Sequence, residues 1–130
     1  MSILVAYIPT PKGEAALDAA IERAVQFGTS LHLVNVVRDS VESDPRHASA
    51  EQLAFALETA RRAGVRDVDS RTRHIDDGDE VAHAIITEIE KTGADTLVLG
   101  ARFGGTDDPR YLGNTIQTVI ADSPADVLIV

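Results

Sequence analysis

Glycine, amide and hydroxyl residues near the carboxyl end of the chain have the types and order of a phosphate-binding loop. Gly100 follows an apolar run, and Gly113 precedes Asn114 and Thr115, where a helix is expected to begin. Glycines let backbone N–H groups approach phosphate oxygens, a hydroxyl adds a donor, and the positive end of the following helix favours the anion. Such residues bind and orient a phosphate or a nucleotide.

Other side chains of the same loop act in opposite directions. Arg102 and Arg110 attract a phosphate group, whereas Asp107 and Asp108 repel it, so the net charge of the loop is near zero. Phe103 either packs under the loop or fills the space in which a phosphate or sugar would sit. The loop alone therefore leaves nucleotide binding open.

Catalytic and metal-binding patterns are weak elsewhere in the chain. The absence of cysteine excludes thiol catalysis and Cys-ligated metals, and no G-x-S-x-G motif is present. The residues His74, Asp76, Asp77, Asp79 and His83 could ligate a divalent cation, or Asp79 could cap the helix that follows while His83 faces solvent. We predict no enzyme and no metal site.

Overall charge limits the partners of this protein. The formal net charge is −9 and the pI is near 4.7, which argues against nucleic acid and anionic membrane surfaces. No apolar run reaches the length of a membrane helix, and the first residues lack a basic leader, so we expect a cytoplasmic protein. The few lysines and many aspartates suggest either a high-salt cytosol of a halophile or simple acidic solubility.

Apolar strands alternate with amphipathic helices along the whole chain. The strands are expected at Ile3–Ile8, 30–37, 68–75, 96–100 and 126–130, with four helices between them. This order predicts one α/β domain over residues 1–130, with a Rossmann-like, doubly wound, five-stranded parallel sheet of order 3-2-1-4-5. A ligand crevice then opens at the carboxyl ends of strands 1 and 4. The polar segment 38–52 is predicted to be a mobile loop with a ragged helix start.

Three longer stretches carry a family resemblance. The opening "ILVAY", the segment "GDEVAHAIITEIEKTGADTLVLGAR" and the closing "LGNTIQTVIADSPADVLIV" resemble the universal stress protein family over essentially the whole chain. That resemblance implies a dimeric stress-response protein whose last strand, 126–130, pairs with its twin. An apolar edge strand of this kind invites pairing, so we expect a homodimer, together with an unidentified protein partner.

Departures from the family pattern affect the nucleotide site. Nucleotide-binding members carry G-x2-G-x9-G-[ST] after strand 4, and here Phe103 replaces the second glycine and Asn114 replaces the Ser or Thr. ATP-binding members also end strand 1 with an Asp, where this chain has Ile8. These changes favour a loop that has lost nucleotide binding, and Asn114 then serves only as a helix cap.

The alternative is an ATP- or AMP-binding switch with magnesium. In that case the resemblance implies that Gly100, Gly113, Asn114 and Thr115 hold the phosphates and that Arg102 adds charge. The backbone near Val36 would meet the base, beside the crevice residues Ile8, Pro9 and Thr10. Phe103 would stand in the phosphate path.

Overall fold

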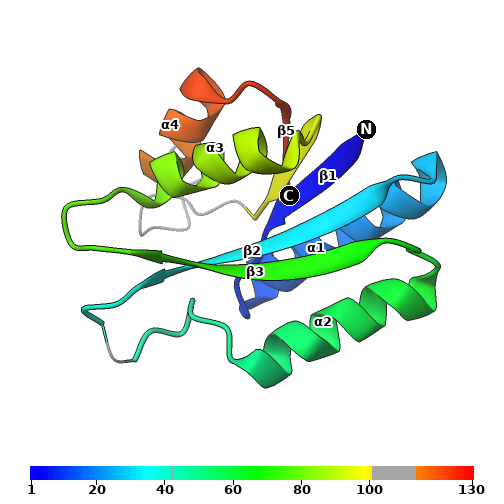
Figure 1. The fold of residues 1–130 in the computed structure, drawn as a ribbon, viewed down its shortest axis with the longest axis horizontal. Coiled ribbons are helices and arrows are strands. Elements are labelled where there is room, and N and C mark those ends of the chain that lie inside the picture. Colours follow the sequence, from blue (N-terminus) through cyan, green and yellow to red (C-terminus); the bar gives the residue numbers. More distant parts are fainter. Residues whose placement is uncertain (42, 101–113) are drawn as a thin grey trace.

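The computed structural model describes residues 1–41, 43–100 and 114–130, and these form five strands and four helices. In chain order they are β1 (Ser2–Ala6), α1 (Pro11–Phe27), β2 (Ser30–Arg38), α2 (Ala50–Ala63), β3 (Val68–Ile75), α3 (Val81–Thr92), β4 (Thr96–Leu99), α4 (Asn114–Asp122) and β5 (Asp126–Ile129). Figure 1 shows the strands side by side with helices on both faces. The predicted α/β class is confirmed.

One parallel sheet contains all five strands in the order β3-β2-β1-β4-β5. The predicted strand order is therefore correct. Strand β1 lies at the centre, where Ile3 pairs with Leu31 of β2 and with Thr96 of β4. Because β1 and β4 are joined to helices on opposite faces, their carboxyl ends flank the point at which the strand order reverses.

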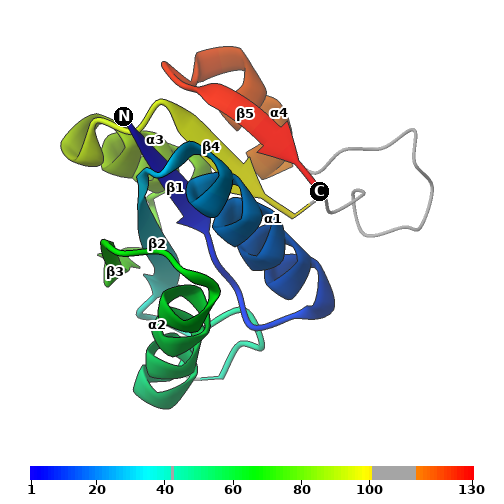
Figure 2. The same ribbon diagram turned by 90° about the vertical axis from the view of Figure 1, so that its right-hand side faces the viewer.

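Two apolar layers cover the two faces of the sheet. Helices α1 and α2 pack on one face over Val5, Leu33 and Val98, and α3 and α4 pack on the other over Leu4, Val34 and Leu97. Figure 2 shows the helices on either side of the strands. Successive strand residues point to opposite faces, so a strand covered on both faces must be apolar throughout, as the central strands are.

Helix boundaries follow local capping chemistry. Thr10 caps α1 and Pro11 occupies its first turn, as the sequence predicts. The predicted ragged start of α2 is wrong, because Ser49 and Gln52 form a reciprocal capping box. Gly28 and Gly64 close α1 and α2 with positive φ angles of 61° and 111°.

None of the helices placed by the structure combines the length and the apolar character needed to cross a bilayer.

Candidate functional site

The turn between β1 and α1 forms one wall of the predicted crevice. Ile8, Pro9 and Thr10 are half-buried there, and the Thr10 amide donates to the Ile8 carbonyl at 2.9 Å. The Thr10 hydroxyl accepts from the Gly13 amide at 3.2 Å. The only hydroxyl on this wall is thus engaged in capping α1.

Gly13 brings the first turn of α1 onto the end of β1. A Cβ atom at position 13 would lie 1.8 Å from the Ile8 carbonyl oxygen, a distance no side chain could occupy. Sequence analysis missed Gly13, although a glycine in the first turn of a helix is a signal, since glycine is unfavourable there without a special reason. Close backbone packing is that reason.

Gly100 makes a similar contact from β4. A Cβ atom at position 100 would lie 2.6 Å from the Lys12 carbonyl oxygen. The sequence assigned Gly100 to the approach of a phosphate, and the structure supplies a second use, which is the packing of α1 against the end of β4. The ends of β1 and β4 are therefore bridged by the first turn of α1.

Val36 lies near the end of β2, half-buried against the apolar layer under α3 and α4. The Val34 carbonyl accepts from the Tyr7 amide at 2.8 Å, and backbone groups two residues apart on a strand face the same side. The Val36 backbone is consequently turned toward the end of β1. Its assigned role in meeting the base stays a prediction.

Asn35 is the buried polar residue of this region, and sequence analysis missed it. Its side chain is fully buried, its Nδ2 donates to the carbonyls of Tyr7 and Arg46, each at 2.9 Å, and its Oδ1 accepts from the Ala48 amide at 2.9 Å. An amide within an apolar strand was the available signal. Asn35 holds the segment 44–48 against the carboxyl ends of β1 and β2.

The segment 44–48 is also stabilised internally. Arg46 donates to the Asp44 carboxylate from its side chain at 2.7 and 3.0 Å and from its amide at 2.8 Å. The Arg46 side-chain hydrogen bonds hold the pKa of Asp44 well below its usual range. His47 accepts from the Arg38 amide through Nε2 at 3.3 Å. These contacts hold a segment that the sequence predicted to be a mobile loop.

Tyr7 joins the end of β1 to α1. Its hydroxyl donates to Glu14 at 2.5 Å, and its ring is buried in the layer under α1 and α2. Burial, and then the Glu14 carboxylate, raise the pKa of Tyr7 above its usual value. The phenol therefore acts as a neutral donor that fixes the first turn of the helix.

The phosphate half of the predicted site is described only in part. Asn114 is exposed and Thr115 half-buried in the first turn of α4, with Asn114 as its first helical residue. Arg102, Phe103 and Gly113 lie outside the described residues, as do Asp107, Asp108 and Arg110. Their assigned roles stay predictions.

The acidic segment before α3 forms a turn. The predicted Asp79 cap is wrong, because Glu80 is the N-cap residue without a side-chain cap bond, and Asp79 instead accepts from the Asp76 amide at 3.0 Å. His83 faces solvent as predicted and pairs with Glu80 at 3.6 Å. The part of the chain that the structure describes contains no group of His, Asp and Glu side chains arranged to hold a metal ion.

The model of the universal stress protein family matches this chain over residues 1–130. The chain belongs to the universal stress protein family. A universal stress protein of Mycolicibacterium smegmatis is 26% identical over 128 residues, covering 98% of this chain and 95% of that protein. The universal stress protein Rv2319c of Mycobacterium tuberculosis is 25% identical, and the chain spans 48% of its length.

Solved universal stress proteins share the fold. The crystal structure of one in complex with cAMP matches with a TM-score of 0.79 at 23% identity, covering 100% of this chain and 96% of that one. A universal stress protein from Archaeoglobus fulgidus in complex with dAMP matches with a TM-score of 0.69 at 18% identity, covering 98% and 94%. At this level of identity the likeness establishes the fold, whereas the ligands belong to those two proteins.

Proposed function

We propose that this universal stress protein is a non-enzymatic, cytoplasmic stress-response protein that works as a homodimer through a protein partner. Its β1–β4 crevice retains the shape of a nucleotide site without holding a nucleotide tightly. The observation that carries this proposal is the packing at the crevice wall, where Gly13 lies against Ile8 and Gly100 against Lys12.

The chemistry of the wall supports the same conclusion. Ile8 has no side-chain group that could accept a hydrogen bond from a base or ribose, and the Thr10 hydroxyl already accepts one hydrogen bond, from the Gly13 amide. A nucleoside donor placed beside the Ile8 side chain would stay unpaired, which is unfavourable in a half-buried site.

Calorimetry tests the proposal directly. ATP with magnesium is titrated into the purified protein in low and in high potassium chloride, after confirming that no nucleotide co-purifies. We expect no heat of binding in either salt. Micromolar affinity in either condition would overturn the proposal.

A gain-of-function variant serves as the positive control. Ile8→Asp, Phe103→Gly and Asn114→Ser together restore the family pattern, and we expect this triple variant to bind ATP. A triple variant that still does not bind ATP would mean that Ile8, Phe103 and Asn114 are not the reason for the lost binding.

A second candidate is the nucleotide switch, which the cAMP and dAMP complexes of structural neighbours favour. In this alternative ATP or AMP, with magnesium, lies beside Val36, and Gly100, Gly113, Asn114 and Thr115 hold its phosphates with Arg102 nearby. Gly113→Val should then abolish binding by blocking backbone approach. Retained affinity in that variant would contradict this site.

The homodimer is proposed to form through strand 126–130. The amides of Asp126 and Val130 donate to the carbonyls of Asp95 and Leu99 on the β4 side, so the amide of Val127, which alternates with them, faces the outer edge of β5. Val127→Pro removes that outward donor, and edge strands tolerate proline at such a position. We expect a folded monomer by light scattering and circular dichroism, and a persisting dimer would contradict pairing through β5.

A further inference from the structure

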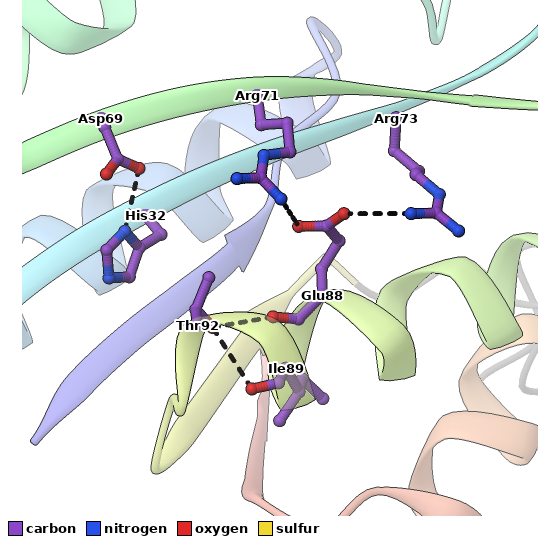
Figure 3. Close-up of polar contacts among 7 residues, drawn as sticks. All are labelled: His32, Asp69, Arg71, Arg73, Glu88, Ile89 and Thr92. Atoms are coloured by element: carbon purple, nitrogen blue, oxygen red, sulfur yellow. Dashed lines mark hydrogen bonds and ion pairs between the residues drawn. The ribbon is translucent and has the colours of Figure 1, made fainter.

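Glu88 of α3 is a buried carboxylate outside the crevice. Its side chain is 1% exposed, and it lies between Arg71 and Arg73 of β3, as Figure 3 shows. Arg71 Nη1 donates to Glu88 Oε2 at 3.2 Å, and Arg73 Nη1 lies 3.6 Å from Oε1. A buried charge persists only when it is paired, so Glu88 holds the two guanidinium groups on the α3 side of β3.

With respect to the residues that the structure describes, most donors of these two arginines stay free for another acceptor. A guanidinium group carries five N–H donors, and Arg71 gives one of them to Glu88 while Arg73 makes only the longer ion pair. The side chains are 56% and 32% exposed. Two cations face one carboxylate here, and the neighbouring Asp69 is bound to His32 at 2.9 Å. The cluster therefore keeps a local positive charge on an acidic protein.

The backbone of β3 is open along its outer side. Strand β3 is the last in the sheet order of the described residues. The carbonyls of Asp67 and Ile75 accept from the amides of Leu31 and Asp39 on the β2 side. In a parallel ladder this turns the backbone N–H and C=O groups of the alternate residues Ser70 and Thr72 outward. These outward groups can bond to one more strand.

We propose that the outer edge of β3 binds an extended acidic segment of a partner protein as an additional strand. Its backbone pairs with Ser70 and Thr72, and carboxylates at every second position contact Arg71 and Arg73. Glu88 acts as a positioning residue that keeps the two guanidinium groups together. This mode gives affinity through main-chain hydrogen bonds and specificity through alternate side chains. The inference rests on the part of the proposed function that assigns a protein partner.

Charge complementarity favours an acidic segment over a second copy of this chain. Two copies paired through β3 would bring four guanidinium groups to one face, and like charges on neighbouring strands repel. Carboxylates at alternate positions would instead form charge-assisted, forked hydrogen bonds with each arginine.

A pair of matched peptides tests the proposal on the full chain. One capped peptide alternates glutamate with threonine along a length matching β3, and its sequence isomer groups the glutamates in adjacent pairs, which places them on opposite faces of a strand. We expect calorimetry at physiological salt to detect binding of the alternating peptide and about tenfold weaker binding of the isomer. Equal affinity for both peptides would overturn the strand geometry.

Variants distinguish the contribution of Arg71 and Arg73 to peptide affinity from the effect of the protein's overall charge. Arg71→Gln with Arg73→Gln should weaken peptide binding by about tenfold or more, and the same pair combined with Glu88→Gln should show the same loss without a buried unpaired carboxylate. Arg71→Lys with Arg73→Lys should bind with intermediate affinity, because lysine keeps the charge but not the fork. Arg62→Ala, at an exposed ion pair of α2, is the matched control and should leave the affinity unchanged.

Other results would overturn the proposal. Inorganic phosphate that displaces all of the peptide at equal concentration would indicate a site for free anions. Dimerisation through β3 that persists in the Val127→Pro variant would indicate that a second copy of the chain occupies this edge. The ATP titration on the same preparation tests the proposed function separately. A heat of binding with ATP would contradict the proposal that the crevice does not hold a nucleotide tightly, and it would leave the proposal of peptide binding at β3 unaffected.

Discussion

The crevice beside β1 and the outer edge of β3 are shaped by different parts of the chain. At the crevice, main-chain atoms of Ile8 and Lys12 meet the Cα atoms of Gly13 and Gly100, so the shape depends on the absence of side chains. At β3, the surface consists of long charged side chains fixed by Glu88. Crevice geometry can thus persist after its ligand chemistry has changed, whereas a charged edge can change while the fold stays the same.

Gly13→Ala should give the largest effect, because the new methyl group would collide with the Ile8 carbonyl. We expect a loss of about 3 kcal/mol or more in the free energy of unfolding, measured by urea denaturation. Alanine is otherwise the better helix former, so the sign of the change isolates the contact.

Gly78→Ala is the matched control for this prediction. A Cβ atom there would meet no atom within 4 Å, and we expect a change of less than about 0.5 kcal/mol. A Gly13→Ala protein as stable as the wild type would mean that backbone packing does not shape the crevice.

At the outer edge of β3, the free energy of unfolding should fall more when Arg71 and Arg73 lose their charge than when Glu88 loses its charge. Arg71→Gln with Arg73→Gln leaves the Glu88 carboxylate buried and unpaired, and we expect a loss of about 2–3 kcal/mol in the free energy of unfolding, less than for a fully buried pair because both arginines are partly exposed. Adding Glu88→Gln should restore most of this loss. Equal stability of the double and triple variants would show that the Glu88 charge is not the cause.

Asn35 connects the two regions through β2, and its removal should have an intermediate effect. Asn35→Ala leaves the buried Tyr7 carbonyl without its Asn35 donor and releases the segment 44–48, for an expected loss of about 2 kcal/mol in unfolding free energy. Limited trypsin digestion should then cut faster after Arg46. An unchanged cleavage rate would indicate that Asn35 does not hold this segment.

The smallest predicted effect concerns acid stability at Asp44. Its folded-state pKa is depressed, so its stabilisation is complete above the ordinary value of about 4 and is lost as the pH falls below that value. We expect Asp44→Asn to reduce the free energy of unfolding by about 1 kcal/mol at neutral pH. The difference between the two proteins should shrink below about pH 4, and a difference that is constant with pH would contradict the assignment.

Sequence patterns predicted the architecture well because each depends on local rules. Strand burial accounts for the predicted run Ile3–Ile8, of which β1 includes the part up to Ala6. Capping accounts for the Thr10 and Pro11 start of α1, and edge position for the polar alternation of β3. Strand order followed from the handedness of crossovers. These features need no knowledge of which distant residues meet.

Contacts between distant residues were the part that patterns could not supply. The sequence pattern did not single out Gly13 and assigned Gly100 only to a phosphate-binding loop, because the contacts of these glycines with Ile8 and Lys12 appear only in the folded chain. Glu88 lies on a helix among exposed glutamates, and only the position of β3 makes it buried. Asp79 is of a residue type that often caps helices, but Glu80 is the N-cap residue of α3. The Asp79 carboxylate instead accepts from the Asp76 amide in the turn before the helix.

The pairing of β1 with β4 has a consequence for synthesis of the chain. Ile3, Leu4 and Val5 pair with Thr96, Leu97 and Val98, so the centre of the sheet is completed only after most of the protein has been translated. Strands β1, β2 and β3 with α1 and α2 form a contiguous first part that can begin to assemble on the ribosome. Until β4 emerges, one side of β1 stays unpaired, so the incomplete sheet has an open edge at the strand that later lies at its centre.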